Sequence, residues 1–368
     1  MSSSQKPTLP AFGSGCITDV MPYLLRGSRG TGRLPIEIGT TSKRVLLVLD
    51  GLGWDQLQNR QAVAPTMHAM AGGPITTVAP STTATALTSL TTSLTPGEHG
   101  VVGYRMVVDG QVLNTLRWGS PETPDARRQM PPDVLQPYEP FQGQDVPLVS
   151  KADFRRSGFS AAHLRGAHLV GYRTTATLVH EIARELREGA EFVYAYYDGV
   201  DKVSHEYGFG TVFDSEVGFA DQLVSDVIAA VPAGTEVIVT ADHGQVDCGD
   251  NVIHLHEDVD RLVSGLSGEG RFRWLHCEPG GIDELAAAAE EHHGDTAWVF
   301  TRQQMFDEGW FGPVIRRGVE DRFGDVALCP FEPVAYFDPA DTGPFELIGR
   351  HGSLTDAEML VPLLRAEA

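Results

Sequence analysis

The chain has 368 residues, of which 42% are hydrophobic and 8% aromatic, a composition typical of a soluble globular protein. Its formal net charge of −21 argues against nucleic-acid polymers and anionic membranes as partners, because both require a positively charged surface. The sequence contains no apolar stretch of about eighteen residues, the length needed for a membrane span. A small anionic substrate stays compatible with this charge, because bound cations would reverse the local potential.

The beginning of the chain is predicted to lie outside the main fold. Residues 1–40 are expected to form a lead-in, at first flexible and without the apolar region of a secretory signal, to a single domain at 41–368. The four cysteines lack the close spacing of a disulfide framework or a zinc ribbon. Scattered cysteines indicate a reducing environment, so we expect a cytoplasmic protein. Nothing in the sequence predicts the oligomeric state.

Apolar runs alternate with segments of helical spacing along much of the chain. Strands are predicted at 44–50, 75–79, 191–197 and 236–240, and helices at 54–70, 83–94 and 214–230. Several of the apolar runs are hydrophobic on both faces, as in buried parallel strands. Because strands that alternate with helices imply crossover connections, we predict an α/β fold with a mostly parallel central sheet flanked by helices.

Two regions interrupt this alternation, at about 103–150 and about 250–345. The first contains Asp109-Gly110, a dipeptide that favours a tight hairpin turn, and then a proline-rich stretch. The second contains the hairpin-like segment GRFRWLHC, a helix at 282–293 and a strand at 296–301. We expect both regions to be insertions that form a cap over the central fold.

Carboxylates follow three of the predicted strands. Asp50 ends the first strand, and Asp201 and Asp242 each follow a later strand within a few residues. In open α/β sheets, functional residues gather at the carboxyl ends of the strands, so we expect these side chains to share one site. Asp198 is the nearest competitor to Asp201, but it lacks a histidine at helical spacing.

Three histidines accompany these carboxylates. His205 lies four residues after Asp201, so on a helix both side chains would lie on one face and could bind one ion. His243 is adjacent to Asp242, as suits a loop, and His351 occurs late in the chain. Carboxylates and imidazoles without thiolates favour zinc, manganese or iron over calcium.

A hydroxyl-rich segment follows the second predicted strand. A threonine at the N-terminus of a helix most often caps that helix with its side-chain oxygen. Alternatively its hydroxyl is a metal-activated nucleophile, and the helix N–H groups bind phosphoryl oxygens. Composition alone does not choose between Thr82, Thr83 and Thr85.

Other histidines have ordinary structural interpretations. His254 and His256 alternate in VIHLH, which fits one face of a strand. His292 and His293 end a predicted helix, where exposed histidines favour the helix dipole. Taken singly, Asp50 is best explained as a helix cap, and an isolated His-Gly pair as a turn. Ordinary caps and turns do not explain all five of these segments occurring together in this order.

The ordered motifs D-G-L-G, P-x-x-T followed by T-S-L-x-P-x-x-H-G, D-x-x-x-H, D-H-G and H-G resemble those of the alkaline phosphatase superfamily. Within it, the chain resembles the nucleotide pyrophosphatase/phosphodiesterase family and its phosphonoacetate-hydrolase relatives. The resemblance runs from Asp50 to His351, and the cap regions between the motifs match poorly. D-H-G alone is a weak signal, whereas five motifs in order are a strong one.

The resemblance implies two divalent metal ions, zinc or manganese. Position by position, one ion would be held by Asp50, Thr83, Asp242 and His243, and the other by Asp201, His205 and His351. Counting back from the motif at 96–100 places the family's nucleophilic threonine on Thr83.

The pattern departs from the family at one position. The family usually has an asparagine shortly after the first H-G, and here Tyr104 and Arg105 occupy that place. Either side chain could contact a phosphoryl oxygen, so both are predicted substrate-binding residues. Trp54 and Tyr104 are also candidates for stacking on a nucleobase.

The resemblance implies a metal-dependent phosphodiesterase that hydrolyses nucleotide-type diesters through a phospho-threonine intermediate. Overall similarity to actinobacterial enzymes of this family makes cyclic di-AMP one expected substrate. A first alternative is hydrolysis of a carbon–phosphorus bond, with Arg105 or Lys202 binding the substrate carboxylate. A second is a non-catalytic relative that binds metal or nucleotide, although retention of all the ligands argues against it.

Overall fold

The computed structural model describes residues 6–26, 33–39, 43–341 and 346–368. Its central sheet has seven strands in the order β2-β17-β8-β1-β7-β5-β6. Their bounds are β1 (Arg44–Leu49), β2 (Ala71–Thr76), β5 (Pro147–Lys151), β6 (His168–Tyr172), β7 (Phe192–Tyr197), β8 (Glu236–Thr240) and β17 (Leu360–Glu367). Neighbours from β8 to β6 pair in parallel, whereas β17 is antiparallel to β2 and β8. The predicted α/β fold with a mostly parallel sheet is therefore confirmed.

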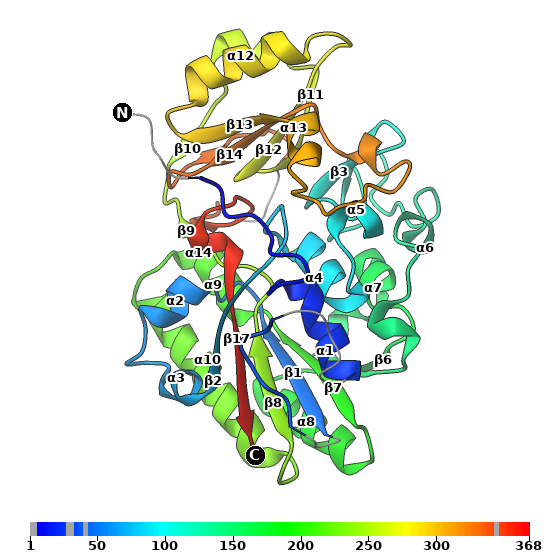
Figure 1. The fold of residues 1–368 in the computed structure, drawn as a ribbon, viewed down its shortest axis with the longest axis vertical. Coiled ribbons are helices and arrows are strands. Elements are labelled where there is room, and N and C mark those ends of the chain that lie inside the picture. The colour runs from blue at the N-terminus through cyan, green and yellow to red at the C-terminus, as the bar shows by residue number, and fades with distance from the viewer. Residues whose placement is uncertain (1–5, 27–32, 40–42, 342–345) are drawn as a thin grey trace.

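Helices flank this sheet, which explains why its inner strands are apolar on both faces (Figure 1). One group packs α8 and α10 against the sheet, and α1, α4 and α7 form a second group. The bounds of these helices are α1 (Val20–Arg26), α4 (Thr83–Thr92), α7 (Gly158–His163), α8 (Thr175–Arg187) and α10 (Thr211–Ala230).

A second, antiparallel sheet lies above the central sheet in the view of Figure 1, and α12 covers its outer side. Its strand order is β11-β12-β14-β13. The bounds are β11 (Gly265–Glu269), β12 (Phe272–His276), α12 (Ile282–His293), β13 (Ala297–Thr301) and β14 (Val326–Pro330). The predicted hairpin, helix and strand of this region are confirmed. We call the segment from β11 to β14 the cap.

The predicted turn in the earlier insertion is also confirmed. Asp109 and Gly110 have φ of 49° and 77° and connect β3 (Arg105–Val108) to β4 (Gln111–Asn114). The remaining short elements are η1 (Ile17–Asp19), α2 (Trp54–Gln58), α3 (Pro65–Ala69), α5 (Pro96–His99), α6 (Pro132–Leu135), η2 (Pro140–Gly143), η3 (Ala152–Arg156), α9 (Gly199–Tyr207), β9 (Val246–Asp247), β10 (Val252–Ile253), α11 (Glu257–Asp260), α13 (Arg302–Asp307), η4 (Glu320–Arg322), β15 (Ala335–Tyr336), β16 (Gly349–Arg350) and α14 (Asp356–Met359).

Two predicted elements have different boundaries. The helix expected at 54–70 is divided into α2 and α3, because Pro65 restricts the preceding residue to a non-helical conformation and begins a new helix. The strand expected at 75–79 starts earlier, at Ala71, and includes Pro74. This strand lies at the edge of the sheet, where a proline without an N–H is tolerated.

The prediction of a separate lead-in is wrong for the described part of residues 1–40. Ile17, Val20, Met21 and Leu24 are buried in the main hydrophobic core. The backbone of this segment is also tied to the sheet, since Thr76 N donates a hydrogen bond to the Gly15 carbonyl at 2.9 Å. Residues 1–5, 27–32 and 40 lie outside the described residues. Apolar spacing over one short helix was too brief a signal to be recognised.

A buried ion pair joins the cap to the central fold. Arg271, in the turn between β11 and β12, contacts Glu358 of α14 through Nε at 2.7 Å and Nη2 at 2.8 Å. Both side chains are fully buried. Three backbone carbonyls, of Pro330, Glu332 and Val334, accept further hydrogen bonds from the guanidinium. The charge is thus fully paired, as a buried ion requires.

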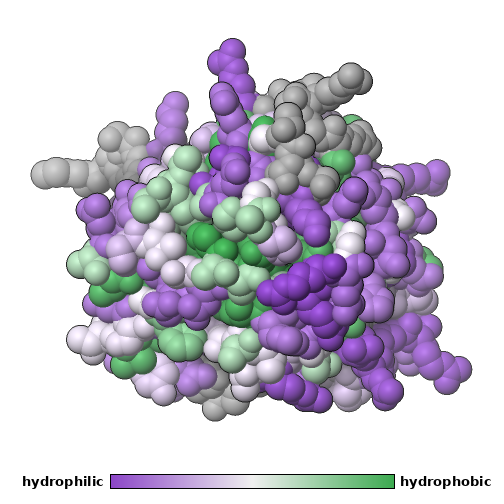
Figure 2. Space-filling model, turned by 90° about the horizontal axis from the view of Figure 1, so that it is seen from below, coloured by the Kyte–Doolittle hydropathy of each residue, from purple (hydrophilic) through white to green (hydrophobic). Residues whose placement is uncertain are grey.

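The face of the molecule seen in Figure 2 is largely hydrophilic, with a smaller apolar area near its centre. Among the described residues, no helix combines the length and apolar character needed to cross a membrane.

Replacing Arg271 by methionine is expected to lower the free energy of unfolding by about 3–5 kcal/mol, because the buried Glu358 carboxylate would lose its cationic partner. Among the described residues, this carboxylate would keep only the hydrogen bonds from Ser353 N and Thr355 Oγ1. Chemical denaturation of the variant measures this loss. The control is Arg261→Met, which breaks a surface ion pair with Asp258; the Arg261 side chain is 71% exposed. For such surface pairs, a change of about 0–1 kcal/mol in the free energy of unfolding is expected. Equal, small effects at both positions would contradict the account of the cap attachment.

Candidate active site

The three predicted carboxylates meet at one edge of the central sheet. Strand β1 lies between β7 and β8, and all three run parallel. Asp50 directly follows β1, Asp242 follows β8, and Asp201 lies in the first turn of α9, just after β7. Adjacent parallel strands therefore deliver all three side chains to one place, as expected for functional residues of such sheets.

Asp50, Thr83, Asp242 and His243 form the group that we call site 1. His243 Nε2 lies 3.6 Å from Asp50 Oδ1 and 3.6 Å from Asp242 Oδ2, and 3.0 Å from Thr83 Oγ1. Both of these carboxylate oxygens are buried and lack a hydrogen-bond partner among the described residues. Buried carboxylates without partners are costly, and a divalent cation would satisfy them. The donor set therefore fits a metal ion.

Asp201, His205 and His351 form the second group, site 2. Asp201 Oδ1 lies 3.2 Å from His205 Nε2 and 4.0 Å from His351 Nε2. The expected helical spacing of Asp201 and His205 is present in α9. A carboxylate with two imidazoles is a common ligand set for zinc and related metals.

The histidines are oriented by the backbone. Nδ1 of His243, His205 and His351 contacts the carbonyl oxygens of Gly244, Gly349 and Ser81 at 3.0, 2.6 and 3.0 Å. A carbonyl only accepts, so each Nδ1 carries the proton and each Nε2 keeps its lone pair for the site. This arrangement is typical of metal-binding histidines, whose other nitrogen donates to the protein.

The two sites adjoin each other. The rings of His243, from site 1, and His351, from site 2, are stacked with centroids 3.7 Å apart. The structure thus brings the six predicted ligands together in the two groups that the resemblance implied. That they bind metal ions stays a prediction.

Burial and crowding shift the pKa values of these groups. Burial, and then the charges of Asp242 and Asp201, hold the pKa of Asp50 well above its ordinary value. Burial also raises the pKa of Asp201, but the nearby His205 outweighs it and lowers that pKa below its usual range. The pKa of His351 is lowered by burial and then by the neighbouring His243. Ionised Asp50 is therefore poorly compensated by the protein alone.

Residues that the sequence did not single out support the ligands. The Tyr196 hydroxyl donates to Asp50 Oδ2, and Gln245 Nε2 donates to Asp201 Oδ1 at 2.8 Å. Gln245 in turn accepts a hydrogen bond from Ser204. Gly51 makes room for Gln245, because a Cβ at this position, where φ is +74°, would lie 2.3 Å from Gln245 Nε2. Only the adjacency of Gln245 to the D-H-G motif could have marked it in the sequence.

The structure distinguishes between the three threonines left open above. Thr83 begins α4, and its Oγ1 contacts His243 of site 1. Thr82 Oγ1 instead donates to Glu269 of the cap at 3.1 Å. Thr85 Oγ1 is buried without a hydrogen-bond partner among the described residues. Only Thr83 places its hydroxyl against the predicted ligands.

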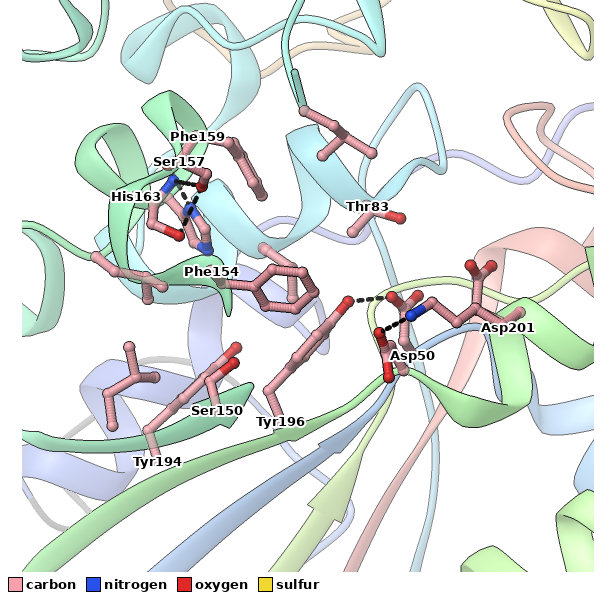
Figure 3. Close-up of a pocket in the computed structure, with 17 residues that line it drawn as sticks. Asp50, Thr83, Ser150, Phe154, Ser157, Phe159, His163, Tyr194, Tyr196 and Asp201 are labelled. Carbon is pink, nitrogen blue, oxygen red and sulfur yellow. Dashed lines mark hydrogen bonds and ion pairs between the residues drawn. The ribbon is translucent and has the colours of Figure 1, made fainter. Parts of the chain in front are cut away.

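A cavity of about 220 Å³ opens beside Thr83, Asp50 and Asp201 (Figure 3). Its walls come from α4, β5, β7, α9 and the segment 154–164, and many of its side chains are aromatic or aliphatic. They include Leu87, Leu116, Leu148, Phe154, Phe159, Leu164, Tyr194 and Tyr196. Mostly apolar cavities with a few polar groups are the usual sites of small-molecule binding.

Tyr104 and Arg105, the predicted substrate-binding residues, are not among the residues that line this cavity. Arg105 is buried, and its guanidinium donates to Asp338, and to Asp341 at 2.8 Å. Two carboxylates thus occupy the Arg105 side chain, which argues against its predicted contact with a phosphoryl oxygen. Trp54 also lies outside the cavity lining.

Two interpretations of other histidines are wrong. His254 and His256 do not lie on a strand, because β10 ends at Ile253. His293 is buried and packs edge-on against Tyr336, so it is not an exposed residue of the helix end. This contact was not predictable from the sequence, since Tyr336 is distant along the chain.

Comparisons with known proteins agree with this fold and geometry. The family model for type I phosphodiesterase / nucleotide pyrophosphatase matches residues 44–354. Murine ectonucleotide pyrophosphatase / phosphodiesterase 5 has a similar structure, with a TM-score of 0.65 and 17% identity over 88% of this chain and 87% of that one. An inactive variant of that protein in complex with AMP has a TM-score of 0.63, with the same identity and coverage.

Phosphonoacetate hydrolase from Sinorhizobium meliloti 1021, in complex with phosphonoformate, is also similar. Its TM-score is 0.65, with 17% identity over 88% of this chain and 89% of that one. At this identity the likeness shows a shared fold. A comparison of the sequence with curated proteins found no match.

The central sheet, the carboxylate and histidine groups at its edge and the matched family model define a hydrolase of phosphoric diester or pyrophosphate bonds. The chain belongs to the type I phosphodiesterase / nucleotide pyrophosphatase family, within the alkaline phosphatase superfamily. Members of this superfamily depend on divalent metal ions.

Removal of metal is expected to reveal the electrostatic cost of site 1. Because the pKa of Asp50 is raised in the folded protein, the metal-free protein should lose stability as pH rises above about 3.9, the ordinary pKa of an aspartate. In excess chelator at pH 8, Asp50→Asn should therefore be at least as stable as the unchanged protein. Thermal unfolding measures this comparison.

Addition of zinc or manganese should make the unchanged protein more stable than Asp50→Asn. A metal at a hundred times its dissociation constant stabilises the unchanged protein by about 2.7 kcal/mol, and the variant should gain less. Asp153→Asn, which changes an exposed carboxylate, is the control and should follow the unchanged protein throughout. Equal stabilisation of all three proteins by metal would contradict a metal site at Asp50.

Proposed function

We propose that the protein hydrolyses nucleotide-type phosphodiesters, with Thr83 as the nucleophile and a phospho-threonine intermediate. The observation that carries this proposal is the position of the Thr83 hydroxyl. It lies 3.0 Å from His243 Nε2, at the N-terminus of α4, and lines the cavity beside both sites. The N-terminus of a helix also favours the negative charge of a phosphoryl group.

In the proposed first step, the Thr83 hydroxyl loses its proton and its oxygen attacks phosphorus, the bond from phosphorus to the leaving alcohol breaks, and that alcohol takes up a proton. The second ester group stays on the phosphorus, which is now bonded to Thr83. In the second step, water attacks the phospho-threonine, and the threonine hydroxyl and a phosphomonoester are released. Divalent ions bound at sites 1 and 2 would supply charge neutralisation and activation of the attacking oxygens. The imidazoles and carboxylates of the two sites would hold these ions, and we propose zinc or manganese.

The cavity supports a nucleoside as the organic part of the substrate. Its volume of about 220 Å³ is below the range of roughly 300–1,000 Å³ that holds drug-sized ligands, so it would accept one base. Phe154 and Phe159 offer aromatic surface for that base. The similar murine protein was solved with AMP. A dinucleotide such as cyclic di-AMP remains a proposed substrate, with one adenine in the cavity and the other outside it.

A second candidate function has a specific observation in its favour. Lys151 and Lys202 both contact the buried carboxylate of Asp198, each at 2.6 Å, and Asp198 and Lys202 line the cavity. Two cations on one anion leave a net positive charge, which would attract a further anionic group of a substrate. The similar phosphonoacetate hydrolase was solved with phosphonoacetate, and phosphonates are therefore the alternative substrate class proposed here.

We also propose a cytoplasmic location, where the four cysteines, all unpaired, would stay reduced.

Thr83→Ala is expected to lower the turnover of bis-p-nitrophenyl phosphate by at least about a thousandfold, because the nucleophile is lost. Thr85→Val is the matched control, since this hydroxyl is buried but makes no hydrogen bond among the described residues. It should keep most of the activity. Acid-quenched mass spectrometry should detect a p-nitrophenyl phosphoryl group on Thr83 of the active protein. Retained turnover in Thr83→Ala would overturn the proposed mechanism.

The diester and the phosphonate functions predict opposite substrate preferences. The metal-loaded protein should hydrolyse bis-p-nitrophenyl phosphate faster than p-nitrophenyl phosphate, and should release little phosphate from phosphonoacetate. Faster release of phosphate from phosphonoacetate, reduced by Lys202→Met, would favour the alternative. Absence of turnover with every substrate, despite bound metal, would indicate a non-catalytic relative.

A further inference from the structure

His163 forms part of the cavity wall beside Thr83 but has no part in the chemistry described so far. Its side chain is buried, with 4% exposure, and its ring stacks on Phe159 at a centroid distance of 3.8 Å. Nδ1 lies 2.7 Å from the Phe159 carbonyl oxygen. Because that oxygen only accepts, Nδ1 carries the proton and the lone pair is on Nε2.

Nε2 of His163 has no hydrogen-bond partner among the described residues, although the residue lines the cavity. Figure 3 shows the imidazole on the cavity wall close to Phe154 and Phe159. Burial lowers the pKa of His163 to about 4, so the ring is neutral near pH 7. The cavity therefore contains a fixed, uncharged hydrogen-bond acceptor.

The groups next to His163 leave this acceptor without a protein donor. Ser157 Oγ accepts from Ser160 N and donates to Ser160 Oγ, both at 2.9 Å, and neither hydroxyl makes a hydrogen bond to His163 Nε2 within the described part of the chain. Leu164 and Phe154 supply apolar surface nearby. An unpaired acceptor in an apolar site is unfavourable, and a ligand with a matching donor would be selected.

We propose that His163 makes the cavity selective for a nucleobase with an exocyclic amino group, such as adenine, by accepting a hydrogen bond from that group at Nε2. This inference rests on the proposed function, because it requires a nucleotide substrate. An oxo group at the same position would place a second lone pair against Nε2, so bases with a carbonyl there would bind poorly. Phe154 would contact the face of the selected base.

The test compares two substrates that differ at one group, the p-nitrophenyl 5′-phosphodiesters of adenosine and inosine. For the unchanged protein, kcat/KM should be at least about tenfold higher with the adenosine ester, since a hydrogen-bonding site rejects a mismatched analogue strongly. The purine riboside ester, which lacks the amino group, should also be a poorer substrate than the adenosine ester. The ratio is taken within each protein, so a general loss of activity cancels.

His163→Phe keeps an aromatic ring beside Phe159 but removes Nε2, and should reduce the adenosine-to-inosine ratio to near one. His163→Gln, which can present either an amide oxygen or an amide N–H, should give an intermediate ratio and serves if the phenylalanine variant does not fold. His168→Phe makes the same substitution at an exposed histidine of β6 and should keep the original ratio.

The outcomes separate the inference from the function on which it rests. Cleavage of both esters by the unchanged protein without a preference, or a preference kept in His163→Phe, would overturn the role of His163. Failure of the unchanged protein to cleave any diester, including bis-p-nitrophenyl phosphate, would overturn the proposed function instead.

Discussion

The placement of three carboxylates on adjacent parallel strands is the constraint on which the rest of the structure depends. Asp50, Asp201 and Asp242 follow β1, β7 and β8, the three strands at the middle of the sheet. Asp50 and Asp242 are buried, and each has one carboxylate oxygen without a hydrogen-bond partner among the described residues. A folded protein keeps such charges together only if something neutralises them. Histidines with their lone pairs turned inward complete a donor set that suits divalent cations, and the Thr83 hydroxyl adjoins it.

The other features of the molecule are arranged around this edge of the sheet. The cap is fastened to the central fold by the buried pair of Arg271 and Glu358, and one of its residues, Glu269, reaches Thr82 beside the nucleophile. The segment that follows β5, with Phe154 and Phe159, provides an aromatic wall of the cavity. The sheet edge thus supplies the predicted chemistry, and the segment after β5 supplies the surface that would choose a substrate.

Local patterns in the sequence were sufficient for strands β1, β7 and β8, for the pairing of Asp201 with His205 four residues later, and for the hairpin at 109–110, because each depends on nearby residues. Contacts between distant residues were not predictable. The side chain of Arg105 was expected to face the substrate but is held by Asp338, more than two hundred residues further along the chain. The cavity wall around His163 was missed for the same reason, since no motif marks residues that only tertiary packing brings together.

The central claim, that the two groups at the sheet edge are metal sites, is tested most directly by anomalous diffraction from crystals grown with manganese or zinc. The account predicts two anomalous peaks, one among Asp50, Thr83, Asp242 and His243 and the other among Asp201, His205 and His351. Peaks only elsewhere on the molecule, or none in crystals that contain the metal at saturating concentration, would contradict it.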